Sequence, residues 1–311
     1  MMSDSPKIKH GHDTKNTWAE LLESSVSALE TKNLPNARIE AQWILEIASG
    51  YGREELVSNL NTEASILGAK HLNKILNRRL SGEPIQYALG SWSFRQLDLL
   101  VDSRVLIPRP ETEILVDVAH GYLGKCDRDA PLRVCDLGTG SGAIGLSIAQ
   151  ERNDVEVYLV DNSSDALKVA SANLAGLGNH AVKVKVFESN WLDQLPDELK
   201  NSFQLIVSNP PYIASGEELP PEVTNYEPHQ ALFAGERGTE HVESILSSAP
   251  AWLSAGGTVI LEMAPHQTDY AAEIAIGQGY SDVKITDDLT GRKRIVTVSY
   301  THLRAHETSD Y

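Results

Sequence analysis

The chain has 311 residues, of which 41% are hydrophobic and 23% charged, and a formal net charge of −16. This length can bury a large core and predicts about two domains. No apolar run approaches the roughly 20 residues of a membrane span, and the first sixteen residues lack the apolar centre of a signal peptide. Two cysteines are too few for a zinc site or a disulfide framework. We therefore expect a cytoplasmic protein and exclude membrane and secreted classes.

The negative charge is unevenly distributed along the chain. Residues 1–90 hold 10 Lys and Arg against 11 Asp and Glu, so nearly all of the net charge lies beyond them. Proteins that bind nucleic acid tightly draw most of that affinity from Lys and Arg. The acidic part of the chain therefore argues against a nucleic-acid substrate held mainly by its phosphates.

The N-terminal part of the chain predicts a small helical domain. Residues 1–16 are polar and predict a disordered tail, and residues 17–84 carry apolar side chains at helical spacing. Thr17 and Glu20 have the spacing of a capping box at the start of a first helix. This pattern is typical of the core of a helical bundle.

Two further helices and a connector follow in this part of the chain. A second helix is predicted from Pro35 to a stop at Gly50, and a third over residues 66–81, before the break at Gly82-Glu83-Pro84. Residues 85–107 mix alternating and aromatic positions, which predicts a β-hairpin connector.

A glycine-rich turn follows the first predicted strand of the second domain, Leu132–Leu137. A helix is expected from Ala143, and the strand, turn and helix together form a nucleotide-binding unit in which free backbone N–H groups face the ligand. The glycines also fit the dinucleotide fingerprint Gly-x-Gly-x-x-Gly, which ends at Gly145, so they leave the cofactor open. The candidate cofactor-binding residues of this turn are Gly138, Thr139, Gly140, Ser141 and Gly142.

Two further candidates follow the next predicted strands. Asp161 ends the strand of residues 155–160, where a carboxylate can accept hydrogen bonds from both ribose hydroxyls; its alternative role is a helix N-cap. Trp191 follows a third strand expected over residues 181–187, where an indole can pack against adenine; its alternative role is a core aromatic.

The tetrapeptide Asn209-Pro210-Pro211-Tyr212 follows the apolar strand of residues 203–207. Two prolines stiffen the backbone and remove two amide donors. The Asn209 side-chain oxygen and the Pro210 carbonyl can both accept hydrogen bonds from one planar NH2 group, and Tyr212 offers a ring face for stacking. The alternative is an ordinary Pro-Pro turn at the end of a strand.

Strands and helices alternate beyond residue 130, which predicts an α/β fold with a mostly parallel sheet. The later strands are expected over residues 257–262, 280–285 and 294–298, with a helix over residues 269–276. The last two strands predict an antiparallel edge. Successive strands thus deliver the glycine turn, Asp161, Trp191 and Asn209 to one edge of the sheet, where open α/β sheets bind ligands.

These motifs resemble those of a known family. Asp136 before the glycines gives the Asp-Leu-Gly-Thr-Gly-Ser-Gly form that is typical of class I methyltransferases, which bind S-adenosylmethionine in a Rossmann-like domain. The chain resembles the protein-(glutamine-N5) methyltransferases of the HemK or PrmC type from about Thr17 to Thr297. The resemblance also covers the segments 82–90, 106–113 and 226–228 with Ala231-Leu232.

The resemblance implies a function and a set of site residues. It implies transfer of a methyl group from S-adenosylmethionine to the glutamine of the Gly-Gly-Gln motif in class 1 peptide-chain release factors. The methyltransferase domain is then residues 108–297, and the helical bundle contacts the release factor. The implied catalytic residues are Asn209, Pro210 and Tyr212, and the implied substrate-binding residues are these three and Pro211. The residues implied to bind S-adenosylmethionine are Gly138 to Gly142, Asp161, Trp191 and Asn209. No metal is implied.

Two other functions stay open on the residues alone. An N6-adenine methyltransferase could place an exocyclic amine in the same turn after base flipping. A non-catalytic dinucleotide-binding protein is compatible with the glycine spacing, although the Asn-Pro-Pro-Tyr turn argues against it. The adenine methyltransferase has no support from charge or from a recognisable DNA-reading module.

The last residues do not fit the pattern. Residues 298–311 resemble a translated sequencing adapter and predict a non-native tail. Its His302 and His306 have the spacing of a helical metal pair, but we expect no metal there.

Overall fold

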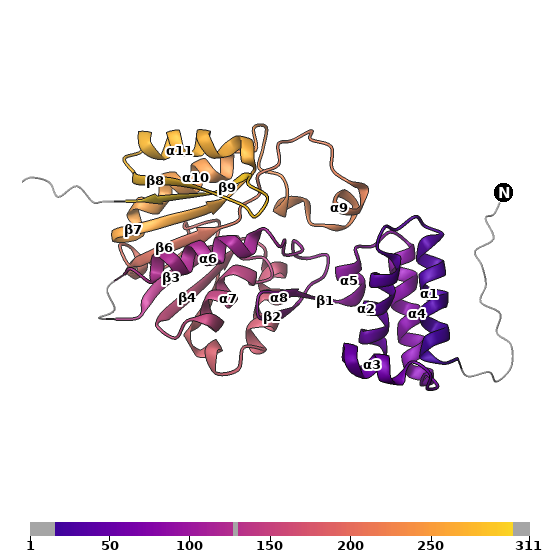
Figure 1. Ribbon diagram of the computed structural model, residues 1–311. Coiled ribbons are helices and arrows are strands. Elements are labelled where there is room, and N and C mark those ends of the chain that lie inside the picture. The colour runs from indigo at the N-terminus through magenta and orange to yellow at the C-terminus, as the bar shows by residue number, and fades with distance from the viewer. Residues whose placement is uncertain (1–15, 127–129, 301–311) are drawn as a thin grey trace, which may run out of the picture. The chain divides into compact units, whose positions relative to one another are not determined.

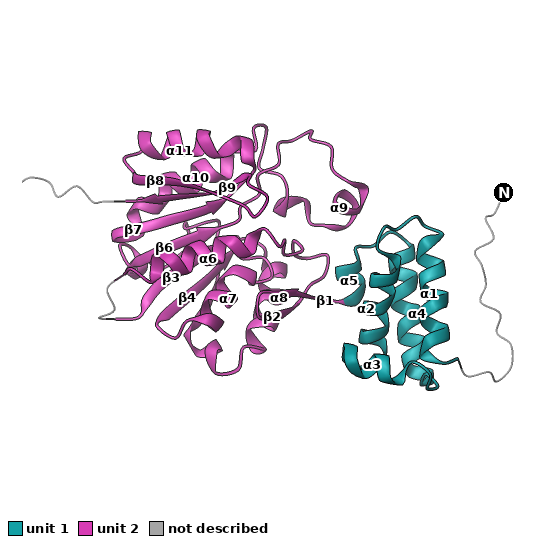
Figure 2. Cartoon of the chain, in the orientation of Figure 1, with its two compact units in different colours: residues 1–89 teal, residues 90–311 magenta. Residues whose placement is uncertain are grey.

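The computed structural model describes residues 16–126 and 130–300, and it divides the chain into two compact units that meet between Leu89 and Gly90 (Figure 2). Within residues 16–89, the first unit contains helices and a single β-bridge between Thr17 and Glu63. Its elements are α1 (Trp18–Glu30), α2 (Ala37–Ser49), α3 (Arg53–Asn59), α4 (Ile66–Leu80) and α5 (Ile85–Leu89).

The helix boundaries of the first unit follow local sequence signals. Thr17 and Glu20 form the predicted capping box, with hydrogen bonds of 3.2 and 2.8 Å, and Gly50 ends α2 in the left-handed conformation. The sequence pattern missed α3. It also assigned residues 85–89 to the connector, whereas they form α5, whose Ile85 and Ala88 are buried in the core of the bundle.

A buried ion pair joins two helices of this unit. The Arg79 guanidinium on α4 donates to both carboxylate oxygens of Glu40 on α2, at 2.7 and 3.0 Å, and both side chains are buried. A buried charge is costly unless it is paired and hydrogen-bonded. The pair therefore fixes how α2 and α4 align, because loss of either partner leaves the other charge buried without compensation.

The second unit contains a seven-stranded sheet in the order β5-β4-β3-β6-β7-β9-β8 (Figure 1). The strands from β5 to β7 pair in parallel, and β9 pairs antiparallel with both β7 and β8. This confirms the predicted α/β fold with an antiparallel edge. The strands are β3 (Leu132–Leu137), β4 (Val155–Asp161), β5 (Val184–Glu188), β6 (Phe203–Ser208), β7 (Leu253–Glu262), β8 (Ser281–Asp287) and β9 (Lys293–Ser299).

Helices cover both faces of this sheet (Figure 1). A separate hairpin of β1 (Ser91–Phe94) and β2 (Leu97–Leu100) precedes them, as the sequence predicts for the connector. The helices are α6 (Thr112–Leu123), α7 (Ala143–Glu151) and α8 (Ser164–Ala175) on one face, α10 (Glu240–Ser248) and α11 (Thr268–Gly277) on the other, and the short α9 (Pro221–Tyr226) after β6.

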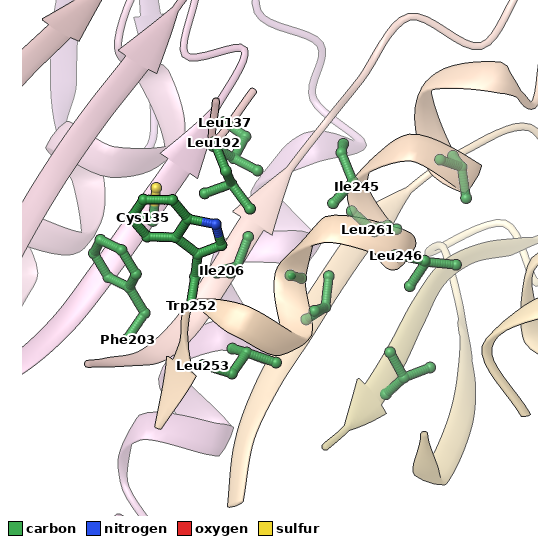
Figure 3. Packing of buried hydrophobic residues seen from close by; sticks show 14 of the residues in the cluster. Cys135, Leu137, Leu192, Phe203, Ile206, Ile245, Leu246, Trp252, Leu253 and Leu261 are labelled. Carbon is green, nitrogen blue, oxygen red and sulfur yellow. The ribbon is translucent and has the colours of Figure 1, made fainter. Parts of the chain in front are cut away.

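The core under α10 and α11 is apolar and tightly packed. Figure 3 shows Trp252 and Phe203 beside Cys135 of β3, and all three side chains are buried. Cys135 is therefore the small buried apolar residue that its strand position predicts, and burial raises the pKa of its thiol well above the usual value.

Several predicted strand limits were wrong, and β7 begins at Leu253 rather than at the predicted Gly257. Residues 178–183 form a 3-10 helix, so β5 begins at Val184 rather than at Ala181, and the exposed Val182 does not face the core. At the other end, β9 continues to Ser299 and Tyr300 packs edge-on against Tyr280, so the expected tail boundary at residue 298 falls inside a strand. His302 and His306 lie outside the described residues.

Gly145 allows α7 to lie close to the sheet. A Cβ atom at this position would lie 2.3 Å from Leu159 Cδ2 and 3.1 Å from Val157 Cγ1. Gly145→Ala should lower the free energy of unfolding by about 1–3 kcal/mol, because both neighbours sit in a packed strand. Urea unfolding measures this change.

Gly121 in α6 provides the matched control. No heavy atom lies within 4 Å of its added Cβ, so Gly121→Ala should raise the free energy of unfolding by about 0.5–1 kcal/mol through helix propensity. Equal effects of the two substitutions would contradict the close helix–strand approach at Gly145.

Candidate active site

The two sequence motifs meet at the carboxyl ends of two neighbouring strands. Leu137, the last residue of β3, pairs with Ser208, the last residue of β6, and the Ser208 hydroxyl donates to the Leu137 carbonyl at 2.6 Å. The strand order reverses between β3 and β6, which is where open α/β sheets hold their ligands. The glycine turn and Asn209 therefore begin side by side.

The glycine turn wraps toward the end of β4. Gly138, Gly140 and Gly142 all have positive φ angles, of 66°, 55° and 87°, which residues with a side chain rarely adopt. The Gly140 amide donates to Asp161 Oδ2 at 2.9 Å, and the Ser163 amide donates to Asp161 Oδ1 at 2.9 Å. The turn thus presents its backbone beside a carboxylate.

Asp161 lies at the position that the sequence predicts, at the end of β4. The N-cap of α8 is Ser163, whose hydroxyl accepts from the Ala166 amide, so Asp161 is not the cap. Burial is the largest effect on Asp161 and raises its pKa, against the hydrogen bonds from the Ser163 and Gly140 amides. A carboxylate has four lone pairs, so the amides of Gly140, Asn162 and Ser163 leave room for a ligand hydroxyl.

Trp191 lies between the core and the cavity. Its indole packs against the buried cluster of β3 and α10, and its Cζ3 atom lies 3.5 Å from the position of an added Cβ at Gly138. The His241 ring lies 5.2 Å from it. Trp191 also has a φ of 50°, a conformation that costs energy outside glycine and is often found at binding sites. The core and binding roles are therefore both compatible with its position.

Two cavities adjoin at Asn209. The first has an empty volume of about 680 Å³ and the second about 570 Å³, both including space that is open to solvent. Asn209 and Pro211 line both. The first is also lined by Gly138, Gly140, Asp161, Ser189, Trp191 and His241, and the second by Arg109, Pro210, Tyr212, Leu219, Val223 and Leu232.

The donor set of the first cavity suits an adenosine-containing ligand. It combines a carboxylate at the end of β4, an indole across the glycine turn and the backbone of Gly138 and Gly140, where no side chain limits the approach of a ligand. Among the residues at 16–126 and 130–300, no group of three or more His, Cys, Asp or Glu side chains could hold a metal ion. No helix in the same ranges is long and apolar enough to cross a membrane.

Several residues around the site were not predicted to act there. Arg109 Nη2 pairs with the buried Glu227 Oε1 at 2.5 Å, and Glu227 Oε2 accepts from the Ile107 amide at 3.2 Å. This pair ties the segment before α6 to the segment after α9 along the wall of the second cavity. Thr112 accepts from Asn209 Nδ2 at 3.2 Å. The only sequence signal was that Ile107, Arg109, Thr112 and Glu227 all lie in segments that carry the family resemblance.

Two protein-family models match parts of the chain. The model described as PrmC N-terminal domain matches residues 20–90, and the model described as Methyltransferase small domain matches residues 116–226. The catalytic domain of hMettl16, solved with the MAT2A 3'UTR hairpin 6, superposes with a TM-score of 0.54 at 17% identity, covering 84% of this chain and 93% of that one. The fold and the paired motifs define a class I methyltransferase domain.

Curated relatives narrow this class. The release factor glutamine methyltransferase of Salmonella typhimurium is 35% identical over 284 residues, which are 90% of this chain and 98% of the relative. That of Coxiella burnetii is 35% identical over 260 residues, 83% of this chain and 90% of the relative. The chain belongs to the family of release factor glutamine methyltransferases. It also matches the bifunctional methyltransferase of Rickettsia typhi at 36% identity, but there it spans only 54% of the relative's length.

A buried carboxylate supports the glycine turn from below. Asp136 Oδ2 accepts from Thr139 Oγ1 at 2.6 Å and from the Gly145 amide at 2.9 Å, while Oδ1 is buried without a partner among the described residues. Burial raises the pKa of Asp136 to about 7, far above that of an Asp in an unfolded chain.

This pKa predicts a pH dependence of stability. Between about pH 4 and pH 7 the folded chain holds a proton on Asp136 that the unfolded chain has lost, so its contribution to stability falls as pH rises through this window. Asp136→Asn keeps the acceptor oxygen and does not titrate. Its stability relative to the parent should rise from pH 5 to pH 8 in urea unfolding, and parallel pH profiles would contradict this assignment.

Proposed function

We propose that this protein transfers a methyl group from S-adenosylmethionine to the side-chain amide nitrogen of the glutamine in the Gly-Gly-Gln motif of class 1 release factors. The observation that carries the proposal is the position of Asn209, in the wall shared by the cavity beside the glycine turn and Asp161 and a second cavity lined by the Asn-Pro-Pro-Tyr turn. The names of the full-length relatives support the substrate.

The first cavity would hold the methyl donor. Asp161 would accept hydrogen bonds from the ribose hydroxyls, Trp191 would pack against the adenine, and the turn from Gly138 to Gly142 would approach the rest of the donor closely. The bound donor supplies an electrophilic methyl group on a sulfonium centre. The half-buried site would also remove water from around this cation.

The Asn-Pro-Pro-Tyr turn would orient the acceptor. An amide nitrogen is a poor nucleophile because its lone pair is conjugated with the carbonyl. Hydrogen bonds from its two N–H atoms to Asn209 Oδ1 and the Pro210 carbonyl would hold the nitrogen toward the methyl group and stabilise the charge that develops on it. Tyr212 would stack on the amide plane. The proton then leaves the methylated nitrogen to water.

The helical first unit would contact the release factor, and the reaction would take place in the cytoplasm with other steps of translation. Exposed apolar side chains at the start of α4, Ile66 and Leu67, are 69% and 79% exposed and are candidate contacts in this unit. The acidic second unit does not favour a nucleic-acid substrate.

Donor binding and acceptor orientation should separate by mutation. Asp161→Ala should weaken S-adenosylmethionine binding by about 1.5–3 kcal/mol, the value of a charge-assisted hydrogen bond. Asn209→Ala should lower the methylation rate by about a hundredfold or more. Calorimetry and single-turnover rates measure the two effects. Asp165→Ala is the control. It removes an exposed carboxylate from the first turn of α8, shortly after Asp161 in the sequence, and should change neither donor binding nor the methylation rate. A full-rate Asn209→Ala protein would refute the mechanism.

The acceptor is tested directly with an intact release factor. Mass spectrometry should find one added methyl group on the Gly-Gly-Gln glutamine, and Gln→Glu at that position should abolish it, because the NH2 group is gone. Duplex and single-stranded DNA and RNA should stay unlabelled. Methylated adenine with an unmodified release factor would establish the nucleic-acid alternative instead.

A further inference from the structure

Two buried polar side chains that line neither cavity, Thr112 and Glu262, lie close to the Asn-Pro-Pro-Tyr turn. Thr112 opens α6 and Glu262 ends β7, with relative exposures of 4% and 1%. Glu262 Oε2 is buried without a partner among residues 16–126 and 130–300.

The orientation of the Asn209 amide decides whether the site can work. A side-chain amide has one accepting end and one donating end of nearly equal shape. Only the oxygen can accept from a substrate NH2 group, and an amide turned by 180° would present its own N–H groups instead. The proposed chemistry therefore depends on whatever fixes the amide.

Thr112 alone cannot fix it, because a hydroxyl both donates and accepts. An ionised carboxylate only accepts, and the Thr112 hydroxyl lowers the pKa of the Glu262 carboxyl, against the rise that burial causes. When the Thr112 proton points to Glu262, only lone pairs remain for Asn209. Asn209 Nδ2 then donates to Thr112 Oγ1, as the 3.2 Å contact has it, and Oδ1 turns toward the cavity.

We propose that Thr112 and Glu262 are positioning residues that lock the Asn209 side-chain amide with its oxygen facing the substrate. This inference rests on the proposed function. Neither residue touches the donor or the acceptor; both act through Asn209. The chain of donors runs in one direction, from the Asn209 amide to the Thr112 hydroxyl to the Glu262 carboxylate.

The charges around Glu262 decide the pH range in which its carboxyl group is ionised and can accept the Thr112 proton. Arg294 on β9 and Arg109 before α6 favour the ionised carboxylate, Glu111 opposes it, and burial is the largest effect, which raises the pKa of Glu262 to about 7. The phenol of Tyr212 also faces this group, since the charge of Glu262 adds to the rise in its pKa. Below pH 7 a protonated Glu262 no longer requires the Thr112 proton, and the amide loses its preference.

The first test removes the hydroxyl. Thr112→Val should lower the single-turnover methylation rate by about tenfold to a hundredfold, with the S-adenosylmethionine Kd and the KM for release factor within about twofold of the parent. Thr112→Ser should restore the rate. Thr297→Val is the control. Its Oγ1 is buried like that of Thr112, but it lies on β9 and has no partner among the described residues, so the rate should not change.

The second test uses pH. The methylation rate of the parent protein should rise between pH 6 and pH 8, as Glu262 ionises. Glu262→Gln does not titrate, so it should lower the rate more at pH 8 than at pH 6 and give a flatter pH profile. A Thr112→Val protein at full rate, or a Thr112→Ser protein as slow as Thr112→Val, would overturn the inference while the parent's activity upholds the proposed function. A parent that leaves the release factor unmethylated would overturn both.

Discussion

The site depends on the pairing of β3 with β6. These strands end at the same level, joined by the register of Leu137 with Ser208 and by the Ser208 hydroxyl bond to the Leu137 carbonyl. Because the strand order reverses at this point, the chains that leave the two strands turn apart and leave space between them. The glycine turn and Asn209 therefore border one opening without any long loop to position them.

The sequence predicted the parts of the fold and site that are local. Strand, glycine turn and helix follow one another in the chain. Asp161, Trp191 and Asn209 each lie at or just beyond the carboxyl end of a strand, so their common edge followed from parallel order alone. The predicted strand of residues 181–187 began too early, because residues 181–183 are the end of a short 3-10 helix. The roles of Asp161, Trp191 and Asn209 toward ligands stay predictions.

The residues that support the site could not be predicted in this way. Thr112 meets Asn209 across 97 positions of sequence, and Arg109 meets Glu227 across 118. No periodicity encodes such partners, because they depend on how α6 crosses the sheet. A polar residue in a helix's first turn reads as a cap or a surface residue, whereas Thr112 is buried and faces inward.

The two cavities share a wall at Asn209 and Pro211. A single compound could therefore occupy both, with a nucleoside in one and a carboxamide in the other, joined by a short linker past the Asn209 oxygen. Such a bisubstrate inhibitor would combine two modest affinities at a high effective concentration. Its selectivity would come from the second cavity. Many enzymes have a nucleoside pocket, whereas the second cavity is lined by Arg109, which the ion pair with Glu227 holds in place.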